Sequence, residues 1–238
     1  MSVQRRAEVT ALARSTLIRA WRPTSGVWSS AELAVRHLTP IPVEKIAKQL
    51  FGLDVEWVPS ISSEHTGLEI SACLDIPRHL ITIANGPGHT LGEQHITLAH
   101  EIYHYIRHRG LSQTVYRERM MKGNEIDDWT RPLREREADW FAVDFTMPEG
   151  LVTGAFHDRY GVPIPLDLVD EQLVYWLESG TKRRLSISDI QSRGINYLRY
   201  LSAVNTWFAG KHFDSLVDHF RVTPTAMGIR LRELHLVR

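Results

Sequence analysis

Cysteine, net charge and long apolar runs are the scarce features of this 238-residue sequence. The single cysteine, Cys73, excludes a disulfide bond within the chain and a CxxC metal site, and it is typical of a reducing cytoplasm. Basic and acidic residues number 28 each, so the overall charge favours neither nucleic acid nor an anionic membrane as the main partner. The sequence lacks a run of about 18 apolar residues and an apolar signal segment. These absences predict a soluble cytoplasmic protein with no membrane partner.

The length predicts a core domain with appendages, because an average domain has about 150 residues. We divide the chain into an N-terminal helical extension (1–40), a core (41–155) and a helical C-terminal region (156–238). Residues 4–21 are amphipathic and carry four arginines, a composition that organelle-targeting peptides share. We favour a docked helix over a targeting peptide, since apolar residues such as Val9 recur where such a helix would bury them.

The first half of the core alternates between helical and strand-like patterns. Residues 42–52 predict a short helix that ends at Gly52, and residues 53–58 alternate like a strand. Two further β-prone runs, 68–74 and 79–85, flank a turn and predict a hairpin. The expected fold class is therefore α+β, mainly helical with a small three-stranded antiparallel or mixed sheet. We expect this sheet to pack on the helix that follows it.

That helix contains ITLAHEIYHYIRH, residues 96–108, which places two histidines on one face. His100 and His104 are one turn apart, so both imidazoles can reach a single ion. An H-E-x-x-H pattern on a helix supplies half of a tetrahedral zinc site in this way. Glu101 is turned by about 100° from His100 and points beside the metal, where it can deprotonate a metal-bound water. The pattern predicts a metal site with its own general base.

A third ligand is needed, because a chain of this composition would contain H-E-x-x-H by chance about 4% of the time. His108 lies about 12 Å along the helix axis from His100, too far to share the ion. A second helix, predicted to end at Met147, carries Glu135 and Asp139 on one face. We predict Glu135 as the third ligand and Asp139 as the acceptor for the outer N–H of a ligating histidine. A solvated acidic patch is the alternative interpretation.

These segments resemble the ImmA/IrrE family of zinc metallopeptidases, within the wider gluzincin group. The resemblance is carried by HITLAHEIYHYIRH (95–108) and EREADWFAVDFTMP (135–148), with PVEKIAKQLFGLDVEWV (42–58) upstream. A looser likeness covers FRVTPTAMGIRLRELHLV (220–237). The sequence departs from the family at Tyr103, where many relatives carry glycine, and in a polar insertion at 111–130. The resemblance implies a site-specific endopeptidase with one Zn²⁺ per chain that cleaves a helix-turn-helix repressor or a similar regulatory protein.

Residues that contact the substrate are harder to assign. The run 79–85 precedes the zinc helix and is predicted as an edge strand that pairs with an extended substrate. Its predicted substrate-binding residues are Leu80, Ile81, Thr82 and Ile83. For the group that stabilises the oxyanion, Tyr103, Tyr116 and His157 stay open as alternatives.

The C-terminal pattern supports an alternative function. Residues 213–234 have the helix, short turn and helix of a DNA-reading unit, with Arg230 and Arg232 on the second helix. The apolar residues of this segment are also what two packed helices need, and the net charge is zero, so direct DNA binding is a secondary expectation. The alternative is a DNA- or repressor-binding regulator whose metal site is structural or vestigial.

Overall fold

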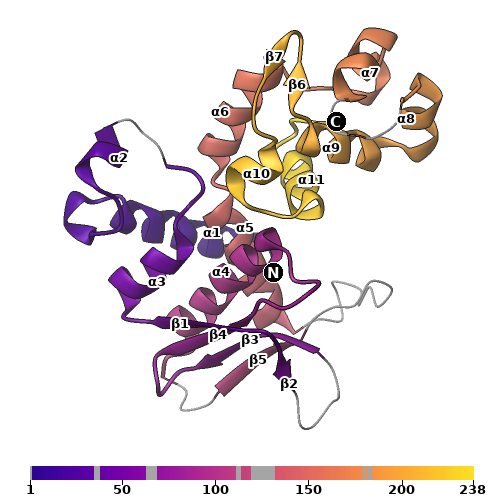
Figure 1. Cartoon of the computed structure of the whole chain (residues 1–238). Helices are drawn as coiled ribbons and strands as arrows, with labels where there is room; N and C mark the ends of the chain where they lie inside the picture. Colours follow the sequence, from indigo (N-terminus) through magenta and orange to yellow (C-terminus); the bar gives the residue numbers. More distant parts are fainter. Residues whose placement is uncertain are drawn as a thin grey trace. The chain divides into compact units, whose positions relative to one another are not determined.

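The chain forms two compact units, residues Met1–Thr146 and Met147–Arg238. The first unit joins the predicted N-terminal extension to most of the predicted core, and the functional limits proposed at residues 41 and 155 stay a prediction. The computed structural model in Figure 1 describes residues 2–34, 38–62, 69–110, 114–118, 132–178, 181 and 184–238.

A mixed sheet forms one side of the first unit (Figure 1). The three predicted strands are β1 (Asp54–Val58), β3 (Glu69–Asp75) and β4 (Leu80–Ala84). β1 pairs in parallel with β4, whereas β3 and β4 form the predicted antiparallel hairpin. Two additional strands, β2 (Ile61–Ser62) and β5 (Thr114–Glu118), pair antiparallel with β3. The predicted α+β class with a small mixed sheet is confirmed.

β4 is an inner strand, which corrects the prediction that it is an edge strand. It lies between β1 and β3 in the sheet, and the residues that pair on both sides are Leu80, Ile81, Thr82 and Ile83. Both ladders of β4 are therefore occupied, and a substrate segment could pair with it only by displacing a strand. Alternation in the sequence indicated a strand but held no information on its neighbours, and the second neighbour, β1, comes from more than 20 residues upstream.

Three short helical segments connect the N-terminal helix to the sheet. They are η1 (Pro23–Ser25), α2 (Ser30–Ala34) and α3 (Val43–Phe51). α3 ends as predicted at Gly52, whose φ of 64° is a left-handed conformation that glycine adopts without a steric penalty. This turn directs the chain into β1.

The histidine-bearing helix, α4 (Leu91–His108), packs against β3 and β4 (Figure 1). Thr90 caps it, because its side-chain oxygen accepts a hydrogen bond from the Glu93 backbone N–H at 3.2 Å. Leu98 and Ile102 are buried, and each such side chain stabilises the fold by about 1.5–3 kcal/mol. The apolar side of α4 is thereby fixed, which sets the direction of its histidines.

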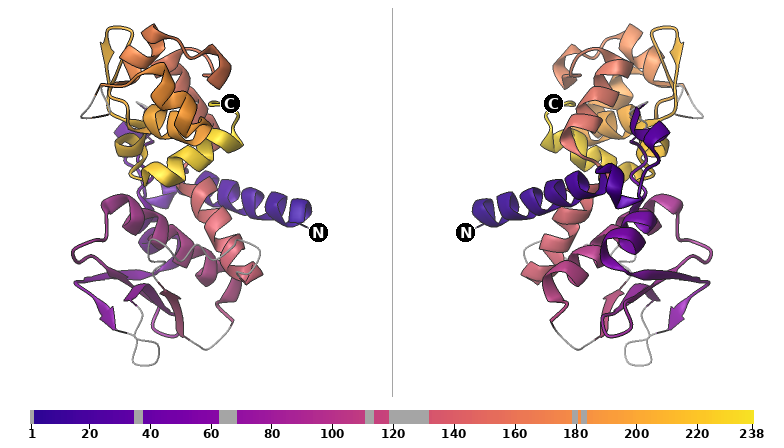
Figure 2. Two further views of the ribbon diagram at one scale, coloured as in Figure 1. Left: turned by 90° about the vertical axis from the view of Figure 1, so that its right-hand side faces the viewer. Right: turned by 90° about the vertical axis from the view of Figure 1, so that its left-hand side faces the viewer.

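α5 (Leu133–Thr146) packs beside α4, and α1 (Ser2–Ala20) crosses α5 (Figure 2). Ala138 of α5 is fully buried, and its small side chain allows close approach between helices. Polar contacts with Asp144 help to anchor α1: Arg6 pairs with its carboxylate at 3.2 Å, and the Thr10 hydroxyl donates to the same carboxylate at 2.6 Å. The N-terminal segment is therefore a docked helix, as favoured from the sequence.

Asp144→Ala is expected to lower the free energy of unfolding of the first unit by about 2–3 kcal/mol. The change removes the shared acceptor of Arg6 and Thr10 from a position where the carboxylate is only 5% exposed. Urea unfolding followed by tryptophan fluorescence measures the effect. Glu8→Ala, an exposed change on α1, serves as the control and should cost less than about 0.5 kcal/mol. Equal stability of the two variants would contradict this docking contact.

The second unit is mainly helical, with apolar side chains such as Phe156, Leu201 and Phe220 in its core. Arg230, on the second helix of the possible DNA-reading unit, is 5% exposed and donates to the Met147 carbonyl and to Glu233. Of the two arginines noted on this helix, Arg232 is exposed and Arg230 is buried. The elements described in this unit are α6 (Glu149–Tyr160), η2 (Leu166–Leu168), α7 (Glu171–Leu177), α8 (Ile187–Arg193), α9 (Ile195–Val204), β6 (Trp207–Phe208), β7 (Lys211–His212), α10 (Leu216–Phe220) and α11 (Pro224–Glu233).

Helices long and apolar enough to cross a membrane are absent from the described residues of both units.

Candidate metal centre

Two helices bring the three predicted ligands together. α4 supplies His100 and His104, and α5 supplies Glu135, which is 35 positions from His100 in the sequence. The two Nε2 atoms are 3.0 Å apart, and Glu135 Oε2 lies 3.3 Å from His100 Nε2 and 3.5 Å from His104 Nε2. Among the described residues, these three side chains form the group that could hold a metal ion.

The spacing of these donor atoms fits a tetrahedral zinc ion. Zinc binds imidazole nitrogen and carboxylate oxygen at about 2.0–2.2 Å, which places two ligands of a tetrahedral ion about 3.3–3.6 Å apart. The separations of 3.0, 3.3 and 3.5 Å are close to this range. Two imidazoles and one carboxylate are also a donor set of catalytic zinc sites, which keep the fourth position for water or substrate.

The centre is buried, and its carboxylate is ionised. His100 is 0% and His104 1% exposed, and the Glu135 side chain is 18% exposed. Burial alone would raise the pKa of Glu135, but hydrogen bonds and charge from the two histidines outweigh burial and lower this pKa. Glu135 therefore presents the anionic form that binds a cation.

Asp139 holds the outer nitrogen of His100, as predicted. Its Oδ1 lies 2.9 Å from His100 Nδ1. A carboxylate can only accept at this distance, so the proton of the neutral ring lies on Nδ1 and the Nε2 lone pair faces His104 and Glu135. This contact fixes both the tautomer and the orientation of the first ligand.

Asp139→Ala is expected to weaken zinc binding by about 10–100-fold, because the His100 ring loses the partner that fixes it. Competition against a chromophoric chelator measures the dissociation constant. Asp54→Ala, an exposed change at the start of β1, should leave the constant unchanged within about twofold. An unchanged zinc affinity in Asp139→Ala would contradict the role assigned to this carboxylate.

Glu101 is fully buried on the turn of α4 that carries His100. Burial, followed by the charges of Glu101 and Asp75, raises the pKa of the Cys73 thiol on β3 to about 11. The burial of Glu101 and its place next to His100 in α4 are compatible with the predicted general base, whose role stays a prediction.

Comparison with known families tests the resemblance seen in the sequence. Residues 63–161 match the IrrE N-terminal-like domain, family Peptidase_M78. The predicted resemblance to the ImmA/IrrE family is confirmed, and the family supports a metallopeptidase-type function. This IrrE-like segment contains α4 and α5 and therefore all three candidate ligands. None of the curated proteins is similar enough to the chain to count as a match.

The three oxyanion candidates belong to different elements of the IrrE-like segment. Tyr103 is buried in α4, and its hydroxyl donates to Glu137 of α5 at 2.8 Å. Burial and this hydrogen bond raise the pKa of Tyr103, so the hydroxyl stays protonated and serves the contact between the helices. His157 contacts the Gly161 carbonyl through Nδ1 within the second unit. Tyr116 belongs to β5, and its side chain lies outside the described part of the structure.

His108 is a residue of the site that the sequence interpretation set aside. His108 is too far along the helix from His100 to share an ion with it. It does contact His104, because the Nδ1 atoms of the two rings are 3.3 Å apart. Burial and the charge of His104 lower the pKa of His108, which favours its neutral form. The spacing of four residues from His104 to His108 is the signal that indicates this contact in the sequence.

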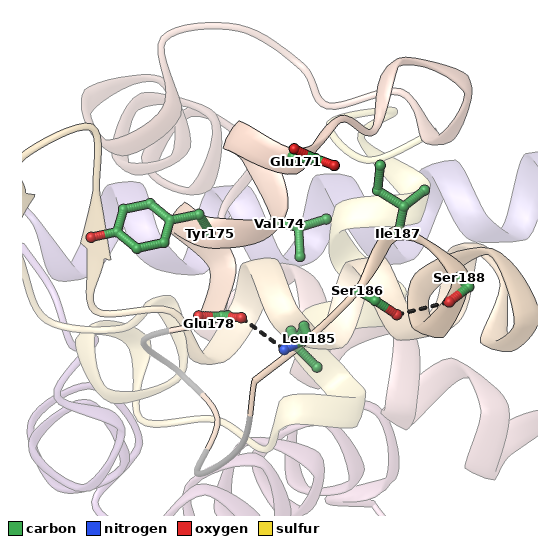
Figure 3. A pocket seen from close by; sticks show the side chains of 8 residues that line it. All are labelled: Glu171, Val174, Tyr175, Glu178, Leu185, Ser186, Ile187 and Ser188. Carbon is green, nitrogen blue, oxygen red and sulfur yellow. Dashed lines mark hydrogen bonds between the residues drawn. The ribbon is translucent and has the colours of Figure 1, made fainter.

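A hollow of about 400 Å³ lies within the second unit (Figure 3). Glu171, Tyr175 and Glu178 line it together with residues 185–188, and Glu178 accepts a hydrogen bond from the Leu185 N–H at 2.8 Å. The described lining contains carboxylates and hydroxyls but no histidine. The hollow therefore lacks the imidazole ligands of the centre on α4 and α5.

Proposed function

We propose that the protein is a zinc-dependent endopeptidase that cleaves a transcriptional repressor, or a similar regulatory protein, at a specific site in the cytoplasm. The observation that carries the proposal is the convergence of His100, His104 and Glu135 inside the segment that matches Peptidase_M78. The family match supports peptidase chemistry, and the donor atoms support zinc as the ion, one per chain. The repressor substrate is supported by the ImmA/IrrE resemblance.

Each residue of the centre has a separate role in the proposed peptide hydrolysis. Zinc held by His100, His104 and Glu135 would polarise the scissile carbonyl and lower the pKa of a bound water to about 7. Glu101 accepts a proton from the attacking water on its carboxylate and delivers it to the leaving amine nitrogen. Asp139 keeps the proton of His100 on Nδ1 and leaves Nε2 as the donor atom. The burial of His100, Glu101 and His104 limits competing contacts with bulk water.

A DNA- or repressor-binding regulator with a structural or vestigial metal site is the second candidate. The observation that favours it is the consecutive helix pair α10 and α11, which has the order expected of a DNA-reading unit. The burial of Arg230 weakens this reading, since a buried guanidinium bonded to Met147 and Glu233 is unavailable to DNA. This candidate predicts salt-sensitive binding that survives Glu101→Gln.

Incubation with candidate substrates tests the proposed function. The purified zinc-loaded protein is mixed with helix-turn-helix repressors encoded next to its own gene, with and without a chelator, and the products are analysed by intact mass spectrometry. We expect one pair of fragments from one repressor, loss of cleavage with the chelator, and recovery on addition of zinc. Stable complex formation or DNA binding without any cleavage would favour the second candidate instead.

A further inference from the structure

We propose that His108 is a positioning residue of the metal centre, which accepts the outer N–H of His104 and so fixes the ring that ligates through Nε2. The proposal rests on the proposed function, because it assigns a role toward the same zinc site. It stands on the 3.3 Å separation of His104 Nδ1 and His108 Nδ1 and on a distance of 5.4 Å between the two ring centroids.

The bonding of His104 requires an acceptor at this place. A neutral imidazole has one N–H and one lone pair, so a ring that ligates through Nε2 carries its proton on Nδ1. His104 is 1% exposed, and an outer N–H at such burial needs a hydrogen-bond partner. Among the residues that the structure describes, His108 has its Nδ1 within reach, and this atom accepts when the His108 proton is on Nε2.

Neighbouring rings restrict the orientation of His108. The Tyr103 ring lies 6.0 Å from the His104 ring and 6.4 Å from the His108 ring, edge to face in both cases. Tyr103 is itself fixed by its hydrogen bond to Glu137. The three rings therefore form a packed cluster on α4, and this packing presents His108 Nδ1 to His104.

The two zinc histidines would then have outer partners of different charge. His100 faces the carboxylate of Asp139, which comes from α5, whereas His104 faces an imidazole from its own helix. An imidazole whose outer N–H is bonded to a carboxylate is a stronger ligand for the metal than one whose outer N–H is bonded to a neutral acceptor. The neutral partner of His104 adds no negative charge to that of Glu135, Asp139 and Glu101, which preserves the ability of the ion to polarise a carbonyl.

Two substitutions separate this role from simple packing. His108→Phe keeps a ring of similar size but removes the acceptor, whereas His108→Asn places an amide oxygen where Nδ1 stood. We expect His108→Phe to bind zinc about 10–100-fold more weakly, as for other outer partners of zinc histidines. His108→Asn should bind within about threefold of the wild type, because the amide can accept the same N–H. Arg109→Ala, the exposed neighbour at the end of α4, is the control.

Three measurements on the whole chain give the outcome: zinc affinity by chelator competition, the visible absorption spectrum of the Co²⁺-substituted protein, and the melting temperature of the metal-free protein. We expect His108→Phe to shift the Co²⁺ bands, His108→Asn to restore them, and the metal-free melting temperatures to agree. Wild-type zinc affinity in His108→Phe, or an equal loss of zinc affinity in His108→Phe and His108→Asn, would overturn the role of His108. Neither result would contradict the proposed peptidase function. A wild-type protein that binds no zinc would overturn both.

Discussion

Glu101→Gln is expected to reduce peptide cleavage by at least about 100-fold while the zinc content stays at the wild-type level. Glutamine has the size of glutamate, but its amide cannot accept the proton of the attacking water, and general-base catalysis contributes about 10²–10⁴-fold. Zinc content should not change, because Glu101 is turned by about 100° from His100 and is not among the three converging ligands. The value of kcat/KM and the zinc content per chain, measured on one preparation, check both parts.

The matched control for this change is Glu56→Gln, which makes the same substitution at an exposed position on β1. It should leave both cleavage and zinc content unchanged. If Glu101→Gln cuts the substrate at the wild-type rate, Glu101 is not the base and the proposed proton transfer is wrong. If the variant loses its zinc as well as its activity, Glu101 has a structural role instead.

Glu135→Ala should abolish stoichiometric zinc binding, with a loss of affinity of more than about 100-fold. The change removes a charged atom that lies 3.3 and 3.5 Å from the two histidine nitrogens. Loss of a direct ligand should exceed the 10–100-fold effect of removing an outer partner such as Asp139. Chelator competition measures the affinity, and cleavage should fall in proportion to the zinc that is lost.

Glu137→Ala is the informative control, because it removes another carboxylate, which is buried, from the same helix. Glu137 accepts hydrogen bonds from Tyr103 at 2.8 Å and from Arg5 at 3.2 Å, away from the three ligands. It should therefore lower stability while the folded protein keeps zinc. Equal zinc affinity in Glu135→Ala and the wild type would show that the ion, if bound at all, is held elsewhere.

Local patterns were sufficient to predict the two helices of the site. His100 and His104 share a face because the helical period brings residues four apart together, and Thr90 marks the start of that helix through a contact within one turn. The same period pairs Glu135 with Asp139 on α5. The meeting of α4 and α5 was inferred from chemistry, since two imidazoles need a third ligand. These features depend on short-range spacing and on the coordination preferences of zinc.

Features that depend on distant pairings were not predictable in this way. The inner position of β4 depends on β1, which lies upstream of the hairpin and pairs in parallel, and no local signal specifies such a neighbour. The hydrogen bond from Tyr103 to Glu137 likewise joins two helices across 34 positions. His108 differs from these cases, because its contact is local. It lies too far along the helix from His100 to share an ion with it, but it contacts His104, four positions away.

Zinc content is the measurement that tests the metal centre most directly. The protein purified without added metal, then reconstituted with zinc and desalted, is analysed by elemental analysis beside a His104→Ala variant. We predict one zinc per chain in the wild type and close to none in the variant, with similar far-UV circular dichroism in both. A wild-type chain that retains no stoichiometric zinc, or a variant that retains it fully, would contradict a metal centre formed by His100, His104 and Glu135.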